Sequence, residues 1–412
     1  MKQDADIIAD IIIVGGGLNG SAAALALAQI GMDVIMIDAM PKEILTAPQF
    51  DGRGYALALT SKNMLNVLGV WVDVAANSCP MLDIKVSDGR AGEGAAPWFV
   101  HFDHTEIEEG PMGYMLEDRF LRQALLRAIG NNAAIQHLDQ TTVVDQKIDA
   151  GGVLVVLADG KTLTAKLLIG CDGRKSQVAV RAGIKRSGWD YNQTSLVCAI
   201  AHELPHKNTA HQFFMPSGPL AILPLNDNVS SIVWTETTAR AAEISAMNDV
   251  DYMACLRPCF GDFLGEISLK GGRYSYPLNL TLADRFVDHR LALVGDAAHG
   301  VHPLAGQGLN LGLRDIAALT EVLALAMRRG EDIGTINVLK RFQQWRRFDT
   351  SSSVASTDSI NKLFSNDNPL LRSIRDAGLG FVNSAPNLRR GLIRQAAGLT
   401  GELPKMLQGK VV

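Results

Sequence analysis

The fold of this 412-residue chain is decided by IIIVGGGLNGSAAALALAQIGMDVIMID, residues 11–38. The stretch opens on Asp10–Val14, an apolar run rich in β-branched residues that predicts a buried parallel strand. Small and aliphatic residues follow at helical spacing over Leu18–Ile30, and Asp33–Asp38 is a second apolar strand that ends in an acid. A strand, a helix and a strand within about thirty residues indicate a βαβ unit.

The loop between the first strand and the helix has the spacing G-x-G-x-x-G. Gly15 permits the tight turn, Gly17 lets the backbone approach a pyrophosphate, and Gly20 lets the helix pack closely on the strand. Asp38, 18 residues after Gly20, is placed to accept hydrogen bonds from ribose hydroxyls. The alternative is a glycine-rich turn with an unrelated acid, but both strands and the acid together favour a dinucleotide site.

A second glycine-rich stretch, LALVGDAAHGVHPLAGQGLNLGLRD at residues 291–315, favours FAD over NAD. FAD is elongated, so its ribityl chain and isoalloxazine ring need a site beyond one βαβ unit. Asp296 suits the ribityl hydroxyls, and a helix predicted over Leu309–Arg329 would direct its first N–H groups at the flavin edge that becomes anionic on reduction. The alternative is a glycine-rich helix cap with Asp296 as an ordinary capping residue.

The rest of the chain predicts an α/β protein of several parts. Proline-bounded strands between Trp189 and Pro277 indicate an inserted antiparallel sheet, and the chain after Gly330 has helical patterns. We expect a Rossmann-type FAD-binding domain, a β-sheet substrate domain and a C-terminal helical region. Their expected limits are 1–75, 101–180 and 285–330 for the first, 76–100 and 181–284 for the second, and 331–412 for the third.

The ordered motifs carry a family resemblance. Asp172-Gly173 lies between the two glycine-rich stretches, and the set resembles the para-hydroxybenzoate hydroxylase-like flavoprotein monooxygenases. Within that group, HPLAGQGLNLGLRD at His302–Asp315 is similar to the signature of the ubiquinone-biosynthesis hydroxylases. Asp51–Arg53 and Gly218–Leu225 are also similar to that family. The chain departs from the family where Ala179 replaces an arginine after the Asp-Gly motif.

The resemblance implies the fold already described and a set of FAD contacts. It also implies hydroxylation of a polyprenylated phenol in ubiquinone biosynthesis, with NAD(P)H as electron donor and O₂ as co-substrate. A flavin-dependent reductase or dehydrogenase of the same fold and a non-catalytic scaffold subunit are the alternatives. The implied cofactor-binding residues are Gly15, Gly17, Gly20, Asp38, Arg53, Arg119, Asp172, Asp296, Gly306, Gln307, Gly308, Leu309 and Asn310.

His302 and Pro303 are the catalytic candidates. His302 could help to deprotonate a phenol and so enrich its ring, whereas the alternative is a structural cap. The apolar strands over Phe213–Leu225 are the candidate wall of the substrate pocket, although ordinary sheet core would have the same pattern. No metal-ligand spacing stands out in the sequence.

Composition limits the partners and the compartment. The net charge of −4 gives no electrostatic footprint for nucleic acid, and five scattered cysteines indicate reduced thiols in the cytoplasm. Three glycines interrupt the uncharged run at Ile11–Met32, so we expect a soluble protein. From Asn361 onward there are eight Lys and Arg residues against three acids. This basic tail indicates either peripheral contact with the inner membrane or a helical subdomain packed on the core. A homo-oligomer or a biosynthetic complex is compatible with the sequence.

Overall fold

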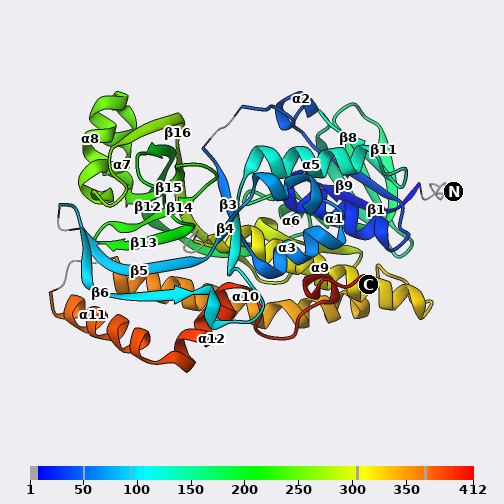
Figure 1. The fold of residues 1–412 in the computed structure, drawn as a ribbon. Coiled ribbons are helices and arrows are strands. Elements are labelled where there is room, and N and C mark those ends of the chain that lie inside the picture. The colour runs from blue at the N-terminus through cyan, green and yellow to red at the C-terminus, as the bar shows by residue number, and fades with distance from the viewer. Residues whose placement is uncertain (1–7, 50–51, 93, 303–305, 366–368) are drawn as a thin grey trace.

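In the computed structural model, the glycine-rich loops follow the carboxyl ends of strands in the first sheet. The structure describes residues 8–49, 52–92, 94–302, 306–365 and 369–412 (Figure 1). The strand order is β17-β18-β11-β1-β2-β8, with β9 and β10 extending from β11. The strands are β1 (Ala9–Val14), β2 (Val34–Ile37), β8 (Ile135–Leu138), β9 (Val143–Ile148), β10 (Val153–Leu157), β11 (Thr162–Gly170), β17 (Val287–Asp288) and β18 (Leu291–Leu293).

The register of the parallel strands brings three distant loops together. Val14 pairs with Ile37 and Gly170, and Gly170 pairs with Leu293, so these strands end at the same level. These strands consist of apolar residues because both faces of the sheet are buried here. The loops that follow β1, β11 and β18 therefore meet at the carboxyl edge of the sheet, where doubly wound folds bind their ligands.

Helix α1 (Leu18–Gln29) covers this sheet and contacts two further helices. It packs against α5 (Asp118–Gly130) and α9 (Gln307–Arg328). The predicted start of α9 at Leu309 is two residues late, because Gly306 is in the left-handed region (φ 64°) and caps the helix. Among the described residues no helix is both long enough and apolar enough to span a bilayer.

The second sheet is mostly antiparallel, with the order β19-β16-β12-β15-β14-β13-β5-β6. Side chains alternate between its faces. On β15, Ile232 and Trp234 pack toward α7 (Thr238–Ala246) and α8 (Asp249–Phe260), whereas Val233 lies on the opposite face. The strands are β5 (Asp83–Arg90), β6 (Gly94–Asp103), β12 (Arg186–His202), β13 (Thr209–Met215), β14 (Gly218–Pro224), β15 (Val229–Thr237), β16 (Ile267–Ala283) and β19 (His299–Gly300).

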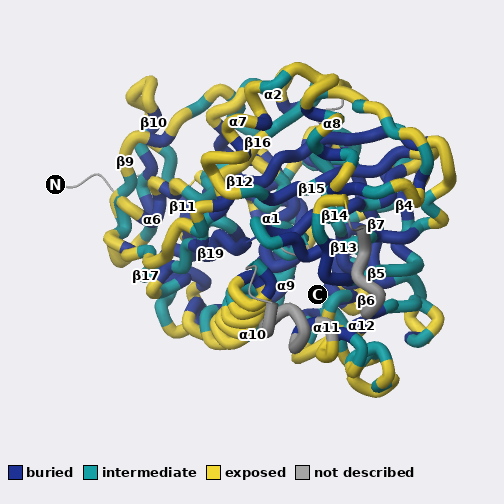
Figure 2. Tube along the Cα trace, turned by 90° about the vertical axis from the view of Figure 1, so that its left-hand side faces the viewer, coloured by how far each residue is buried: buried dark blue, intermediate teal, exposed yellow. Residues whose placement is uncertain are grey.

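The C-terminal helices lie across the second sheet from α7 and α8. Figure 1 shows α10 (Ile336–Phe364), α11 (Pro369–Ser384) and α12 (Pro386–Ala396) running beneath β5 and β6. In Figure 2 the strands are largely buried, whereas α10 carries a long exposed face. The expected α/β architecture with an inserted antiparallel sheet and a helical C-terminal region is confirmed.

Smaller elements complete the fold. A three-stranded sheet, β3-β7-β4, sits between the two large sheets (Figure 1). Strand β6 continues to Asp103 in the second sheet, and the proposed domain limits remain a prediction. The remaining elements are β3 (Gly54–Ala58), β4 (Cys79–Met81), β7 (Gly113–Glu117), α2 (Lys42–Leu45), α3 (Leu59–Val67), α4 (Trp71–Val74) and α6 (Gln177–Arg181), with 3₁₀ turns at Ala75–Asn77, His104–Glu106, Gly295–Ala297 and Lys405–Gln408.

Candidate active site

A cavity of about 1380 Å³ lies where the carboxyl edge of the first sheet faces the second sheet. The loops after β1, β11 and β18 all contribute to it, as does the N-terminus of α9. The residues that line this end are Gly17, Leu18, Asn19, Arg53, Gly173, Arg174, Asp296, Val301, His302, Gly306, Gln307, Gly308, Leu309 and Asn310. The fold thus places the two glycine-rich stretches and the Asp-Gly motif around one cavity.

The glycines of the first loop have different surroundings. Gly15 has a φ of 102°, and a Cβ there would lie 2.4 Å from the Cys171 carbonyl oxygen. A Cβ on Gly20 would lie 1.8 Å from the Gly15 carbonyl oxygen, whereas one on Gly17 would meet nothing within 4 Å. Gly15 and Gly20 are therefore fixed by the packing of the protein itself. Gly17 leaves open space in front of the first turn of α1, where backbone N–H groups are available to a phosphate.

Asp38 lies against this loop at the end of β2 and is buried. Its Oδ1 accepts a hydrogen bond from the Met40 N–H at 2.8 Å, and a Cβ on Gly16 would lie 2.5 Å from its Oδ2. Asp38 is not among the residues that line the cavity. Its predicted contact with a ribose therefore stays a prediction.

The bend after β18 holds Asp296 at the cavity. Gly295 has a φ of 60°, and the Asn19 side chain fills the space where its Cβ would be. Asp296 lines the cavity, and its Oδ2 accepts a hydrogen bond from Arg174 Nε at 3.0 Å. Arg174 also donates to the Val301 carbonyl oxygen at 3.0 Å. This role of Arg174 was not predicted from the sequence, because 122 residues separate it from Asp296.

Asp172 has a local role instead of lining the cavity. Its Oδ2 accepts hydrogen bonds from the N–H groups of Gln177 (2.7 Å) and Val178 (3.1 Å), at the start of α6. The neighbouring Gly173 and Arg174 line the cavity. The Asp-Gly motif therefore reaches the site through the residues that follow the aspartate.

The N-terminus of α9 faces the cavity with Gly306, Gln307 and Gly308. The side chain of Asn310 is used to attach this helix end to β3 and α3. Its Oδ1 accepts hydrogen bonds from the Ala58 N–H (2.9 Å) and from Ser61 Oγ (2.7 Å). The first turn of α9 therefore faces the cavity, while Pro303 lies outside the described residues.

The two predicted arginines have different positions. Arg53 lines the cavity, and its Nη2 is 3.4 Å from Asp118 Oδ2. Arg119 instead donates to Glu117 Oε2 at 2.7 Å and to the Pro48 carbonyl oxygen at 2.9 Å, and is not among the lining residues. Arg122, nearly one helical turn later, lines the cavity and also pairs with Asp118. Helical spacing in α5 was the signal that could have identified Arg122.

His302 is 1% exposed to solvent and lines the cavity. Its ring meets the ring of Tyr191 edge to face, with 5.0 Å between centroids. Burial, and then the positive charge of Arg174, lower the pKa of His302 to about 4. The imidazole is therefore neutral at neutral pH, so it can accept a hydrogen bond at one nitrogen and donate at the other.

The far end of the cavity is apolar and runs between the second sheet and the C-terminal helices. Along the predicted wall Phe213–Leu225, Phe214, Ala221 and Leu223 line the cavity, whereas Phe213 packs in the core under α7 and α8. The opposite wall was not predicted. It comprises Phe348, Ser352, Ser356, Ile360 and Phe364 on α10, Leu379 on α11, and Leu392 and Ala396 on α12.

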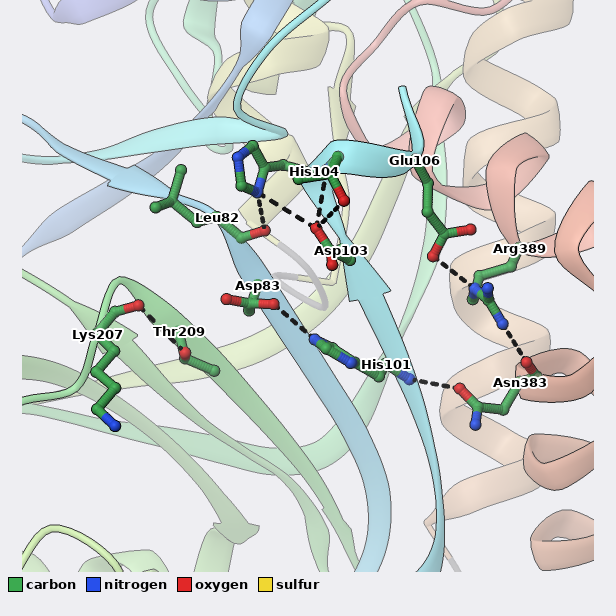
Figure 3. Close-up of polar contacts among 11 residues, drawn as sticks. Leu82, Asp83, His101, Asp103, His104, Glu106, Lys207, Thr209, Asn383 and Arg389 are labelled. Atoms are coloured by element: carbon green, nitrogen blue, oxygen red, sulfur yellow. Dashed lines mark hydrogen bonds and ion pairs between the residues drawn. The ribbon is translucent and has the colours of Figure 1, made fainter. Parts of the chain in front are cut away.

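Three basic residues of the C-terminal region, Arg375, Arg389 and Arg394, form ion pairs with the rest of the protein. Arg375 on α11 donates to Asp88 Oδ2 at 2.9 Å, and both side chains are 3% exposed. Figure 3 shows Arg389 Nε donating to Glu106 Oε1 (2.7 Å) and the His101 N–H donating to Asn383 Oδ1 (3.0 Å). Of the two interpretations of the basic tail, the structure describes the helical subdomain packed on the core.

Comparisons with known proteins agree with this geometry. A family model described as an FAD binding domain matches residues 8–336, and one described as squalene epoxidase matches residues 269–410. The chain is 43% identical to ubiquinone hydroxylase UbiL of Rhodospirillum rubrum, covering 98% of this chain and 94% of that protein. It is 36% identical to 3-demethoxyubiquinol 3-hydroxylase of Escherichia coli, covering 95% and 98%.

Solved structures share the fold. p-Nitrophenol 4-monooxygenase PnpA from Pseudomonas putida DLL-E4 superposes with a TM-score of 0.80 at 18% identity, covering 97% of this chain and all of that one. The flavin-dependent monooxygenase PieE, solved with FAD and substrate, superposes with a TM-score of 0.71 at 19% identity, covering 98% and 73%. At these identities the likeness concerns the fold alone.

Proposed function

The chain belongs to the FAD-dependent hydroxylase family of ubiquinone biosynthesis, and we propose that it hydroxylates the aromatic ring of a polyprenylated phenol with NAD(P)H and O₂. The observation that carries this proposal is the two-ended cavity. One end is built from the glycine-rich loops of the dinucleotide fold. The other is an apolar space of a kind that suits an isoprenoid tail.

The residues at the polar end fit FAD. The space in front of Gly17 suits a pyrophosphate, and a Cβ on Gly308 would also meet nothing within 4 Å. Asn19 also lines this end of the cavity, and its side chain fills the space beside Gly295. Arg53 and Arg122 supply positive charge on the same side. Arg122 is therefore added to the proposed cofactor residues.

Bound FAD supplies electron transfer and the activation of O₂, and the chain supplies the surroundings. We assign Asp296 and the N-terminus of α9 to orienting the flavin, in agreement with their positions at the cavity. Neutral His302 would accept a hydrogen bond from the phenol hydroxyl and so orient the ring. The apolar walls exclude water from the reacting atoms.

The apolar end supports a substrate with a hydrocarbon tail. Val86 and Phe102 come from β5 and β6, and Phe214 from β13 stacks on Phe364 of α10 with 4.1 Å between ring centroids. Leu379 of α11 completes this part of the lining. A phenol without a tail would leave the apolar space to water, which is unfavourable.

The test is turnover under ¹⁸O₂ with a prenylated phenol and, separately, with the same phenol lacking its tail. We expect one ¹⁸O atom in the ring of the prenylated product and a much lower kcat/KM for the phenol without a tail. Oxidation of NAD(P)H with no ¹⁸O in any product would instead identify a reductase, and a chain that retains no flavin would be a scaffold.

A membrane-bound substrate implies contact with the bilayer, and we propose that the corner between α11 and α12 makes it. Phe381, near the end of α11, is 67% exposed, and Leu388 and Arg390, in the first turns of α12, are also exposed. An apolar and basic corner suits an anionic lipid surface. Co-sedimentation with phosphatidylglycerol vesicles is expected, and Phe381→Ser should reduce it without changing flavin content. Equal sedimentation of both proteins would contradict the proposal.

A further inference from the structure

A buried ion cluster joins the Gly295 bend to helices α9 and α10. Asp315, on α9, is 0% exposed, and its Oδ2 accepts a hydrogen bond from the Gly295 N–H at 3.1 Å. The same oxygen lies 2.5 Å from His299 Nε2. The other carboxylate oxygen accepts a hydrogen bond from Arg346 Nε at 2.8 Å, and Arg346 is a buried residue of α10. The C-terminal helical region thus reaches the bend that presents Asp296.

Stability does not explain this cluster. Burial raises the pKa of Asp315, but the charges of His299 and Arg346 outweigh it, so its pKa lies below the ordinary value and the carboxylate is ionised. Buried ion pairs add little net stability, because desolvation offsets the attraction. Arg346 Nη2 and His299 Nδ1 are moreover buried without a hydrogen-bond partner among the described residues, which is unfavourable. The cluster does, however, join the Gly295 bend to α9 and α10.

The geometry that it fixes is the position of Asp296. The Gly295 N–H donates to Asp315, and the next residue, Asp296, lines the cavity. On the other side, Arg346 Nη1 donates to Asp349 Oδ2 at 2.8 Å. Asp349 lies 3.3 Å from Arg314 Nε, and both residues line the cavity. The cluster is therefore a continuous set of contacts from the cavity wall on α10 to the bend.

We propose that Arg346 is a positioning residue of the flavin site. It holds the Asp315 carboxylate in place, and Asp315 in turn fixes the bend at Gly295 relative to the N-terminal half of α9. Both elements that face the flavin then depend on one side chain of α10. The inference rests on FAD as the cofactor and not on the proposed substrate.

The test uses the full chain, stripped of flavin and titrated with FAD. Arg346→Met should raise the Kd for FAD by about tenfold or more, within the range for an unpaired buried polar group. It should also change the visible circular dichroism of the bound flavin. Arg346→Lys, which keeps the charge, should restore part of both signals.

Arg290→Met is the matched control. Arg290 is also buried and pairs with Asp332, 2.5 Å away, but it does not line the cavity. Both Met variants should lower the melting temperature of the apoprotein, and only Arg346→Met should weaken FAD binding. An unchanged Kd in Arg346→Met, or an equal increase in Arg290→Met, would overturn the proposal.

Asp349→Asn provides the test if Arg346→Met does not fold. Because the Asp349 side chain is a quarter exposed, this substitution should destabilise the fold less than Arg346→Met. The expected result is a Kd for FAD raised severalfold, and an unchanged Kd would refute the proposal. Hydroxylation of the phenol is a separate readout. Normal ¹⁸O transfer by the wild-type chain with no Kd effect in these variants would refute the role of Arg346 alone. The Kd effect without ¹⁸O transfer by the wild type would refute the proposed function alone.

Discussion

At the residue scale, two glycines of the same loop differ in whether the folded protein has room for a side chain. Gly17 has an ordinary φ of −62° and open space beyond its Cα, whereas Gly20 is pressed against the Gly15 carbonyl oxygen. The G-x-G-x-x-G motif requires glycine at both positions, but for different reasons. Gly17 leaves space for a ligand, whereas Gly20 is required because the helix packs closely on the strand.

Gly17→Val should therefore give a folded protein that has lost its flavin. The valine side chain would fill a space that no protein atom occupies, and a bound pyrophosphate needs the same space. Absorbance at 450 nm against protein concentration and the melting temperature of the apoprotein measure the two effects. Gly20→Val is the control, and we expect it not to fold. Full flavin occupancy in folded Gly17→Val would contradict the assignment of the loop.

His302 gives a prediction about pH. Its pKa is about 4 in the folded chain and has an ordinary value of 6.5, so only the unfolded chain binds the proton between these values. Its contribution to stability is present above pH 6.5 and is lost as the pH falls toward 4. Urea unfolding should show that His302→Gln loses less stability than the wild type over this window. Identical pH dependence would show that His302 is not held neutral by burial.

At the element scale, helix ends depend on partners that are distant in sequence. The strand–helix–strand unit at residues 11–38 was predictable because its signals are local: apolar periodicity and glycine spacing. The attachment of α9 through Asn310 was not, since its hydrogen-bond partner at Ala58 is 252 positions away. For the same reason, the pairing of Arg174 with Asp296 could not be predicted. Nor could the cavity wall formed by helices α10, α11 and α12.

Helix α11 has a buried ion pair with the second sheet, and the neighbouring helix α12 has a more exposed ion pair with the loop that follows β6. Arg375→Met breaks the buried pair with Asp88, which should lower the free energy of unfolding by about 3–5 kcal/mol. Arg394→Met breaks an ion pair with Glu109 in which Arg394 is 46% exposed, and the expected loss is about 1 kcal/mol or less. Urea unfolding measures both. Equal losses would show that α11 is not anchored through Asp88.

At the scale of the whole molecule, function depends on two parts that the sequence places far apart. The FAD loops come from the first sheet, and the apolar space lies between the second sheet and the C-terminal helices. Sequence motifs identified the first part because phosphate binding requires glycines. For the second part they gave one candidate wall, Phe213–Leu225, but not the wall on the C-terminal helices, since an apolar wall has the same composition as any core.

The apolar space should select substrates by their tails. Leu392→Trp narrows the cavity from α12, so kcat/KM should fall more for a long-tailed phenol than for a short-tailed one. Val250→Trp, on α8, exposed and outside the lining, is the control and should leave the ratio unchanged. A fall in the same proportion for both substrates in Leu392→Trp would place the tail elsewhere.

The most direct measurement is an experimental structure of the full chain with FAD and a prenylated phenol. We expect the isoalloxazine ring against Gly306–Asn310, the phenol beside His302, and the tail between Phe214 and Leu379. Density for the flavin in this position with the tail outside the cavity, or a flavin bound away from α9, would contradict this expectation.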